Sequence, residues 1–253
     1  MTAPSADAME APAPAVKPTA LWEDFIDIFY APSTVFERRR NANPWPMILI
    51  VTVIVTLIGV LTWNSLSPVF ESEIRTQFAK AMAANPQMTA DMVDSQVKIQ
   101  MAFRRWGGVM FPIGVLIFGL LVWAMGRISG AKELTYQRAL VVVAWGSIIS
   151  IVAALVMGVQ GLVLDVSAMT STDALSIGPA RFVDKATTSP ILFALLKQLD
   201  VFNLWTIAVM AIGVQVAGRG TKKTAITFAL IWFIGAFLIS AVMAARAAAA
   251  AGG

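Results

Sequence analysis

Hydrophobic residues gather along this chain in long runs that contain no charged residue. Five such runs occur, at residues 44–66, 107–126, 139–162, 201–217 and 224–245. A helix needs about 20 apolar residues to cross a hydrocarbon core about 30 Å thick, so each run with its flanking residues predicts a transmembrane helix. The fourth run is the shortest, and we expect residues 190–200 to lengthen it. The predicted fold class is all-α, an integral membrane bundle of five transmembrane helices.

The composition agrees with this class and narrows the chemistry. Of the 253 residues, 58% are hydrophobic and only 13% are charged, which is too little charge to cover a soluble protein of this length. The chain has no Cys and no His, which excludes disulfides, Cys/His zinc sites and histidine acid–base relays. We therefore expect no enzyme activity, no metal ion, no cofactor and no nucleic-acid partner.

The polar segments divide the chain into three parts. Residues 1–19 are rich in Ala and Pro, which predicts a disordered tail. Residues 20–245 form the predicted five-span membrane domain. Residues 246–253, almost entirely Ala and Gly, form a low-complexity tail.

Residues 20–30 carry apolar side chains at helical spacing, which predicts a short amphipathic N-terminal helix that Pro32 ends. Its acidic residues, Glu23, Asp24 and Asp27, are expected on a solvated side.

A basic cluster, Arg38, Arg39 and Arg40, follows this helix and directly precedes the first span. Together the helix and the cluster are typical of an element at the membrane surface. Three arginines there predict attraction for anionic lipids, by about 1 kcal/mol each. The alternative is that they only set the topology.

The loop charges predict the orientation. Basic residues are dense before the first span, between the second and third, and between the fourth and fifth, and these segments share one side of a five-span protein. The positive-inside rule makes that side cytoplasmic, with the N-terminus inside and the C-terminus outside. Arg104 and Arg105, which precede the second span on the other side, oppose this assignment.

The first outer segment, residues 67–105, is predicted to be a helical hairpin on the outer membrane face. Its first half carries one apolar stripe with a spacing of four residues, formed by Phe70, Ile74, Phe78 and Met82. Asn85–Pro86 offers a turn, and Thr89 is the expected N-cap of the second helix. Residues 163–189 are rich in Ser, Thr and Asp and are expected to be irregular.

The third span carries four small residues at consecutive i+4 positions, Gly146, Ser150, Ala154 and Gly158. Such positions line one ridge of a helix and let another helix approach closely. We expect this ridge to pack inside the bundle. The alternative is a seam between two copies of the chain, which would make the protein a homo-oligomer.

Lys197 and Asp200 lie at the start of the fourth span, three residues apart, which predicts one shared helix face. Ionisable groups inside a membrane are functional candidates by default. These two are expected at the outer rim, where water is near, so an anchoring role is favoured. Asp200 could pair with Lys197, Arg104 or Arg105; an ion-linked role and partner binding are the alternatives.

Three stretches resemble the Yip-domain family of Ypt/Rab-interacting-protein-like membrane proteins, in a bacterial form. They are "FIDIFYAPSTVFERRR" (25–40), "ISGAKELTYQRALVVVAWGSII" (128–149) and "LKQLDVFNLWTIAVMAIGV" (196–214). In the last, Asp200, Phe202 and Trp205 match the family's Asp-x-Phe-x-x-Trp pattern at the fourth span.

The resemblance implies five spans in a bacterial cytoplasmic membrane, with the N-terminus inside. Eukaryotic relatives are linked to small-GTPase binding, but their acidic-aromatic cytoplasmic motif is not found here, which weighs against a GTPase partner.

We interpret the chain as a non-enzymatic scaffold or organiser. Its expected partners are the lipid bilayer, anionic lipids, and unidentified membrane or cytoplasmic proteins. The alternative is a small transporter or channel component that uses Lys197 and Asp200 as an ion-linked pair.

Overall fold

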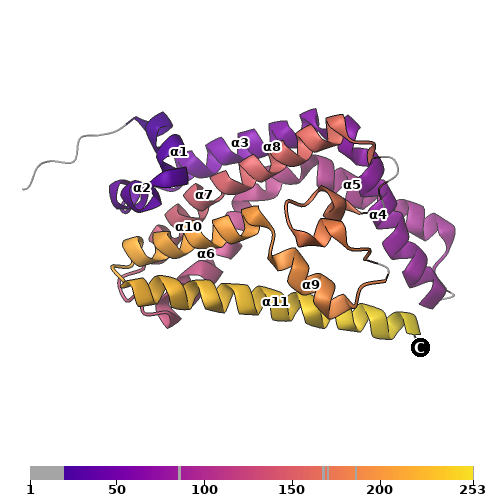
Figure 1. Cartoon of the computed structure of the whole chain (residues 1–253). Coiled ribbons are helices and arrows are strands. Elements are labelled where there is room, and N and C mark those ends of the chain that lie inside the picture. Colours follow the sequence, from indigo (N-terminus) through magenta and orange to yellow (C-terminus); the bar gives the residue numbers. More distant parts are fainter. Residues whose placement is uncertain (1–19, 85–86, 167–168, 170, 186, 253) are drawn as a thin grey trace, which may run out of the picture.

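The computed structural model describes residues 20–252 except 85–86, 167–168, 170 and 186, and every regular element in this part is a helix (Figure 1). The predicted tail at 1–19 and the predicted turn at Asn85–Pro86 lie outside the described residues. The first elements are α1 (Leu21–Tyr30), α2 (Pro32–Arg39), α3 (Trp45–Leu61), α4 (Trp63–Ala84), α5 (Ala90–Trp106), the 3-10 helix η1 (Gly107–Met110) and α6 (Phe111–Ile128). They are followed by α7 (Tyr136–Gly146), α8 (Ile148–Val163), the 3-10 helices η3 (Thr172–Leu175) and η4 (Pro179–Phe182), α9 (Pro190–Gln198), α10 (Val201–Ala217) and α11 (Lys222–Gly252).

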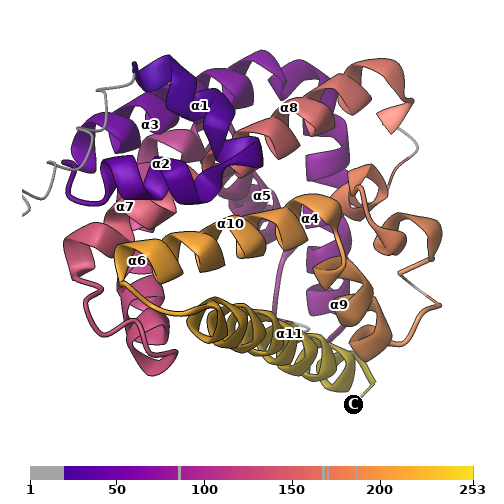
Figure 2. The same cartoon turned by 60° about the vertical axis from the view of Figure 1, so that its left-hand side comes forward.

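The long helices form an elongated bundle with two distinct ends (Figures 1 and 2). At one end lie α1, α2 and the connections α6–α7 and α10–α11; we call this the N-terminal end. At the other lie α4, α5, η3 and η4, which we call the hairpin end. Helices α3 and α8 run side by side along one edge of the bundle, and α11 runs along the opposite edge.

Three helices are long and apolar enough to cross a membrane, Ala90–Ile128, Tyr136–Val163 and Lys222–Arg246. Two further pairs would each supply one span if the bent pair counts as one: α3 with α4, bent by 81°, and α9 with α10, bent by 58°. The all-helical membrane architecture is thus confirmed, with three to five spans by length and composition.

The helix Ala90–Ile128 has 39 residues, about 58 Å at 1.5 Å per residue. This is roughly twice the hydrocarbon thickness, so part of α5 must extend outside the membrane.

The hairpin predicted at 67–105 is present as α4 packed against α5. Ile74 of α4 is buried against Val93 and Val97 of α5, with Phe78 and Met82 packed beside them. Thr89 caps α5 as expected, accepting a hydrogen bond from the Met92 N–H at 3.4 Å. The apolar stripe therefore joins the two helices to each other.

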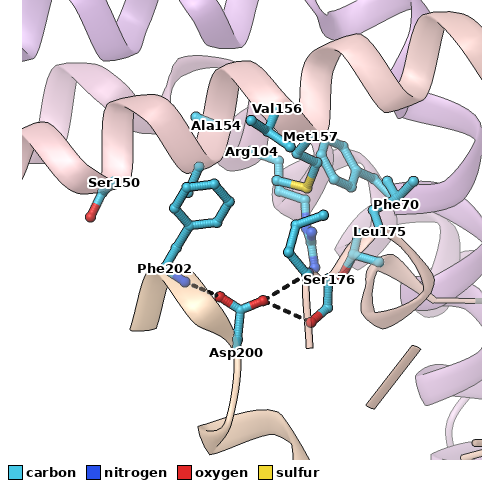
Figure 3. Close-up of a pocket in the computed structure, with 13 residues that line it drawn as sticks. Phe70, Arg104, Ser150, Ala154, Val156, Met157, Leu175, Ser176, Asp200 and Phe202 are labelled. Atoms are coloured by element: carbon cyan, nitrogen blue, oxygen red, sulfur yellow. Dashed lines mark hydrogen bonds between the residues drawn. The ribbon is translucent and has the colours of Figure 1, made fainter. Parts of the chain in front are cut away.

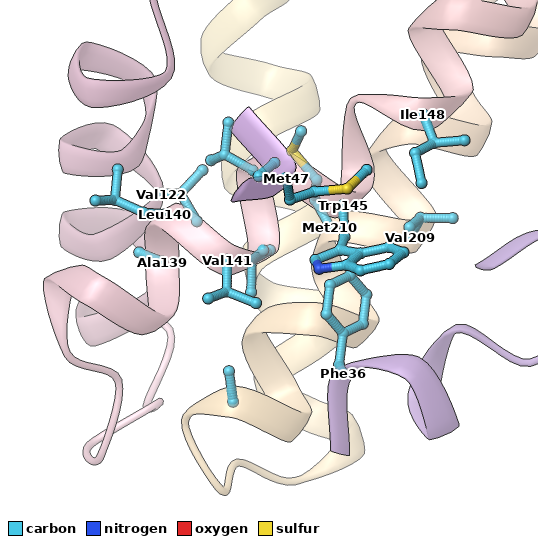
Figure 4. Packing of buried hydrophobic residues seen from close by; sticks show 14 of the residues in the cluster. Phe36, Met47, Val122, Ala139, Leu140, Val141, Trp145, Ile148, Val209 and Met210 are labelled. Carbon is cyan, nitrogen blue, oxygen red and sulfur yellow. The ribbon is translucent and has the colours of Figure 1, made fainter. Parts of the chain in front are cut away.

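The main core surrounds α7, whose residues from Ala139 to Gly146 are all buried. Figure 4 shows Phe36 of α2 close to Trp145 and Met210. Gly213 of α10 makes this approach possible, because a Cβ there would lie 2.8 Å from both Phe36 Cζ and Val142 Cγ1. The short helix α2 is thereby fixed onto α10 and α7.

The outer surfaces of α3 and α11 are apolar and suit contact with lipid. Both carry exposed side chains at i+4 spacing: Leu49, Val53, Leu57 and Leu61 on α3, and Ile226, Leu230, Ile234 and Leu238 on α11. Helix α11 also continues to Gly252, so the predicted low-complexity tail is helical as far as that residue. Alanine has the highest helix propensity, which accounts for the extension.

The prediction that the acidic residues of α1 face water is wrong for Asp24, which is fully buried. Phe25 and Ile28 also face the protein. The exposed positions are Leu21, Trp22, Ile26 and Tyr30, the last three spaced by four residues. The reason is pairing: α2 presents arginines to α1, and a buried carboxylate is stable when it is paired and hydrogen-bonded.

Candidate functional site

The side chain of Asp200 joins the start of α10 to the loop that precedes η4. Its Oδ1 accepts hydrogen bonds from the N–H groups of Phe202 (2.9 Å) and Asn203 (3.2 Å), which makes Asp200 the N-cap of α10. Its Oδ2 accepts from Ser176 Oγ (2.8 Å) and from the Ile177 N–H (2.9 Å). Both carboxylate oxygens therefore have two donors, and the helix N-terminus further favours the negative charge.

The backbone reinforces this junction. The Val201 N–H donates to the Ile177 carbonyl at 3.2 Å. A Cβ on Gly178 would lie 2.8 Å from Asp200 Cα, so glycine allows the loop to lie directly on the start of α10. Sequence reasoning missed Ser176, Ile177 and Gly178, because no local spacing marks a contact between segments this far apart.

Lys197 does not share a helix with Asp200, since it lies in α9 and the chain bends by 58° before α10. Its Nζ pairs instead with Asp173 Oδ1 at 2.9 Å, and Lys185 Nζ pairs with Asp173 Oδ2 at 3.1 Å. The expectation of one shared face is therefore wrong. Burial raises the pKa of the Asp173 carboxyl, but bonds and charge from Lys197, with help from Ser171 and Lys185, outweigh it and hold that pKa below its ordinary value.

A cavity of about 480 Å³ opens beside this junction, between α8, the start of α10 and the hairpin (Figure 3). We call it the α8–α10 cavity. Its walls are largely apolar and include Phe70, Ala153, Ala154, Met157, Leu175 and Phe202. The polar side chains that line it are Arg104, Ser150, Thr172, Ser176 and Asp200.

Arg104 lies in the cavity and is held from one side. Its Nη2 donates to Glu73 Oε2 at 3.3 Å, and its guanidinium stacks on the Phe70 ring at 4.7 Å. Glu73, which is buried, also accepts from Thr172 Oγ1 at 3.0 Å. Glu73 is therefore an internal partner of Arg104 and Thr172 rather than a solvated carboxylate.

The three residues of the Asp-x-Phe-x-x-Trp pattern have different surroundings. Asp200 holds the loop, and Phe202 lines the cavity. Trp205 packs edge-on against Phe29 of α1, with ring centroids 5.4 Å apart. The pattern therefore connects the hairpin end to the N-terminal helix along α10.

The four small residues of the third span face different neighbours. A Cβ on Gly146 would lie 2.9 Å from Met210 Cγ of α10, and Gly158 lies against Thr62 at the end of α3. Ser150 and Ala154, between them, line the α8–α10 cavity. The helix is also interrupted at Ser147, between α7 and α8.

The arginines of the basic cluster are bound within the protein. Arg38 pairs with Asp24 at 2.7 Å and with Asp27, and Arg39 Nε pairs with Asp24 at 2.6 Å. Hydrogen bonds from Tyr30 and Arg38 lower the pKa of the Asp27 carboxyl.

Arg40 reaches the opposite way, to Glu133 at 3.1 Å and to the Ala217 carbonyl at 3.3 Å. The cluster thus ties α1 and α2 to the α6–α7 connection and to the end of α10.

Within the part of the chain that the structure describes, no three acidic side chains gather closely enough to hold a metal ion.

Long apolar helices with charged groups at the bundle ends define a multi-pass helical membrane protein. The Yip1 domain matches residues 26–242, and the chain belongs to this family. It is also similar to the membrane protein YknW of Bacillus subtilis (strain 168), with 27% identity over 213 residues that cover 81% of this chain and 83% of that protein. No solved structure matches the chain. The resemblance carried by the three stretches is confirmed.

Proposed function

We propose that the protein is a non-enzymatic scaffold or organiser in a bacterial cytoplasmic membrane, which binds partner proteins or lipids. Its N-terminus would lie in the cytoplasm and its C-terminus outside. The observation that carries this proposal is the placement of the ionisable groups, which lie outside the five apolar runs of the sequence. None of the five apolar runs contains Asp, Glu, Lys or Arg.

The polar groups inside the apolar helices support the same proposal, because several are bonded to their own backbone. Thr52 Oγ1 donates to the Ile48 carbonyl at 2.7 Å, Ser147 Oγ to Val143 at 2.7 Å, and Thr206 Oγ1 to Phe202 at 2.8 Å. Transporters place ionisable groups near the midplane, where they bind and release a solute. Hydroxyls bonded in this way are poor candidates for such a pathway.

The ion pairs argue against a transporter that uses Lys197 and Asp200 as an ion-linked pair. Lys197 pairs with Asp173, and both oxygens of Asp200 are filled by donors from the loop and from α10. An ion-linked pair would need Lys197 and Asp200 to face each other. Their present partners support a structural role for both residues at the hairpin end.

The test is affinity purification of the full chain from native membranes in mild detergent, with mass spectrometry of the proteins and lipids that co-purify. An unrelated multi-pass protein expressed at the same level supplies the baseline. We expect a reproducible partner set above this baseline that persists in Asp200→Asn. The proposal is overturned by the absence of any enriched partner, together with a tightly bound solute that Asp200→Asn loses.

A parallel measurement addresses transport directly. The purified chain is reconstituted into liposomes, and proton and potassium fluxes are compared with those of empty liposomes. The scaffold proposal expects equal fluxes. A flux that requires the protein and falls in Asp200→Asn would favour the transporter.

A further inference from the structure

We propose that the α8–α10 cavity binds a membrane phospholipid, with the lipid phosphate at Arg104 and part of an acyl chain between α8 and α10. This inference rests on the proposed binding function and deepens it by naming one ligand and its site.

The cavity has the size and surface that an acyl chain requires. Its volume of about 480 Å³ falls in the range typical of small-molecule sites, about 300–1,000 Å³. Ala153, Met157 and Leu175 supply apolar wall, and Phe202 closes the α10 side (Figure 3). A hydrocarbon chain in the cavity would gain van der Waals contacts with this apolar wall.

Arg104 supplies the polar contact. A guanidinium carries five N–H donors, and Arg104 uses one of them in a 3.3 Å bond to Glu73. The remaining donors have no hydrogen-bond partner among the described residues, and about a third of the side chain is exposed. A guanidinium matches the paired oxygens of a phosphate, and such charge-assisted bonds are the strong ones.

The acidic neighbours do not exclude a phosphate. Each oxygen of Asp200 already accepts two hydrogen bonds, and its charge is further offset by the N-terminus of α10. Glu73 is the competitor for Arg104, because its carboxylate accepts the one bond that Arg104 makes. Glu73→Gln removes this competitor and should strengthen the binding of a phosphate, which is the opposite of the effect expected for Arg104→Gln.

The position of Arg104 favours a lipid over a soluble anion. Its neighbour Arg105 stacks on Trp63 and on Trp106, both at 5.6 Å. Tryptophan and arginine gather at the level of lipid headgroups. From Arg104 the cavity extends along α8 to Ser150, which lies within the apolar helix. A phospholipid has the same order, a phosphate at the interface and hydrocarbon beneath it.

The test uses the full-length protein in mild detergent and three probes: dioleoyl phosphatidylglycerol, dioleoylglycerol and inorganic phosphate. Affinity is measured from the rise in the thermal unfolding temperature as each probe is titrated into the protein. Stoichiometry is measured by native mass spectrometry. We expect one phosphatidylglycerol per chain. Arg104→Gln should weaken its binding by about tenfold or more, the loss expected for a charge-assisted bond.

Arg105→Gln is the matched control, because it removes the same charge from the next residue, which stacks on tryptophans outside the cavity. Its affinity for the lipid should stay within about twofold of the wild type, since an exposed charge contributes little. Ala153→Phe fills part of the cavity, leaves the charge of Arg104 in place and should also weaken binding. Unchanged thermal unfolding without lipid shows that each variant is folded.

Equal losses in Arg104→Gln and Arg105→Gln would overturn the proposal, because they would indicate general attraction to a basic surface. Dioleoylglycerol or inorganic phosphate binding as tightly as phosphatidylglycerol would also overturn it. Loss of the lipid site with the co-purifying proteins unchanged would leave the scaffold function standing. If no protein co-purifies above the baseline while the lipid still binds, the scaffold function is overturned and the lipid site stands.

Discussion

The carboxylate of Asp200 accepts a 2.9 Å hydrogen bond from the backbone N–H of Ile177, 23 residues earlier in the chain. The same side chain caps α10, so one residue fixes both a helix start and the loop that covers the hairpin end. The wall of the α8–α10 cavity contains Ser176 and Ile177, and its shape therefore depends on Asp200.

Asp200→Ala should destabilise the protein by about 2 kcal/mol, because it removes an N-cap and two bonds to the loop. Hydrogen exchange should rise in residues 171–178, where the loop loses its anchor. Asp91→Asn, an exposed substitution in the first turn of α5, is the control and should change neither quantity. Unchanged exchange in the loop would show that other contacts hold it.

Asp24→Asn should release α1 from α2. Asp24 is fully buried and pairs with both Arg38 and Arg39, and breaking a buried ion pair costs about 3–5 kcal/mol. Hydrogen exchange across residues 21–39 should rise, and the thermal unfolding temperature in detergent should fall.

The control for Asp24 is Glu37→Gln, which removes a carboxylate from an exposed position of α2. It should leave exchange in α1 at the wild-type level. If Asp24→Asn also leaves that exchange unchanged, the aromatic contacts of Phe25 and Phe29 must hold α1 without the ion pairs.

The features that the sequence predicts well are local ones. The stripe through Ile74 and the cap at Thr89 follow from spacing within one helix, and both are present. The pairing of Asp24 with Arg38 depends on how two helices pack, so the sequence predicts a solvated Asp24 although this residue is buried. The sequence pattern does not mark the bend between α3 and α4, because the apolar run continues across it.

Gly213→Ala should loosen the contact between α2 and α10. Its Cβ would lie 2.8 Å from the Phe36 ring and from Val142, and neither side chain has a flexible end that could move away. Overpacking of this kind costs about 1–3 kcal/mol. Gly235→Ala on α11 is the matched control, since a Cβ there meets nothing within 4 Å and the change should be neutral or stabilising. Equal thermal unfolding temperatures for the two variants would contradict the packing argument.

The ion pairs of Asp173 should give stability that depends on pH. Its folded-state pKa is lower than the ordinary value, so the contribution is present above about pH 4 and is lost as the pH falls through the folded pKa. The unfolding temperature of the wild type should therefore exceed that of Asp173→Asn by a constant amount above about pH 5, and the difference should shrink below about pH 4.

Asp94→Asn, at an exposed pair with Arg75, serves as the control and should stay close to the wild type throughout. A difference for Asp173→Asn that grows as the pH falls would mean that the sign of the pKa shift is wrong.

The number of spans and their orientation can be tested with single cysteines, because the chain has none of its own. Ser33 and Thr221 are exposed at the N-terminal end, and Thr76 and Thr187 are exposed at the hairpin end. A five-span protein with its N-terminus inside predicts that a membrane-impermeant maleimide labels Thr76→Cys and Thr187→Cys in intact spheroplasts. Ser33→Cys and Thr221→Cys should react only after permeabilisation, which also confirms that all four thiols are accessible. If Thr76→Cys instead behaves like Ser33→Cys, the bent pair of α3 and α4 returns to the side on which it began and does not cross the membrane.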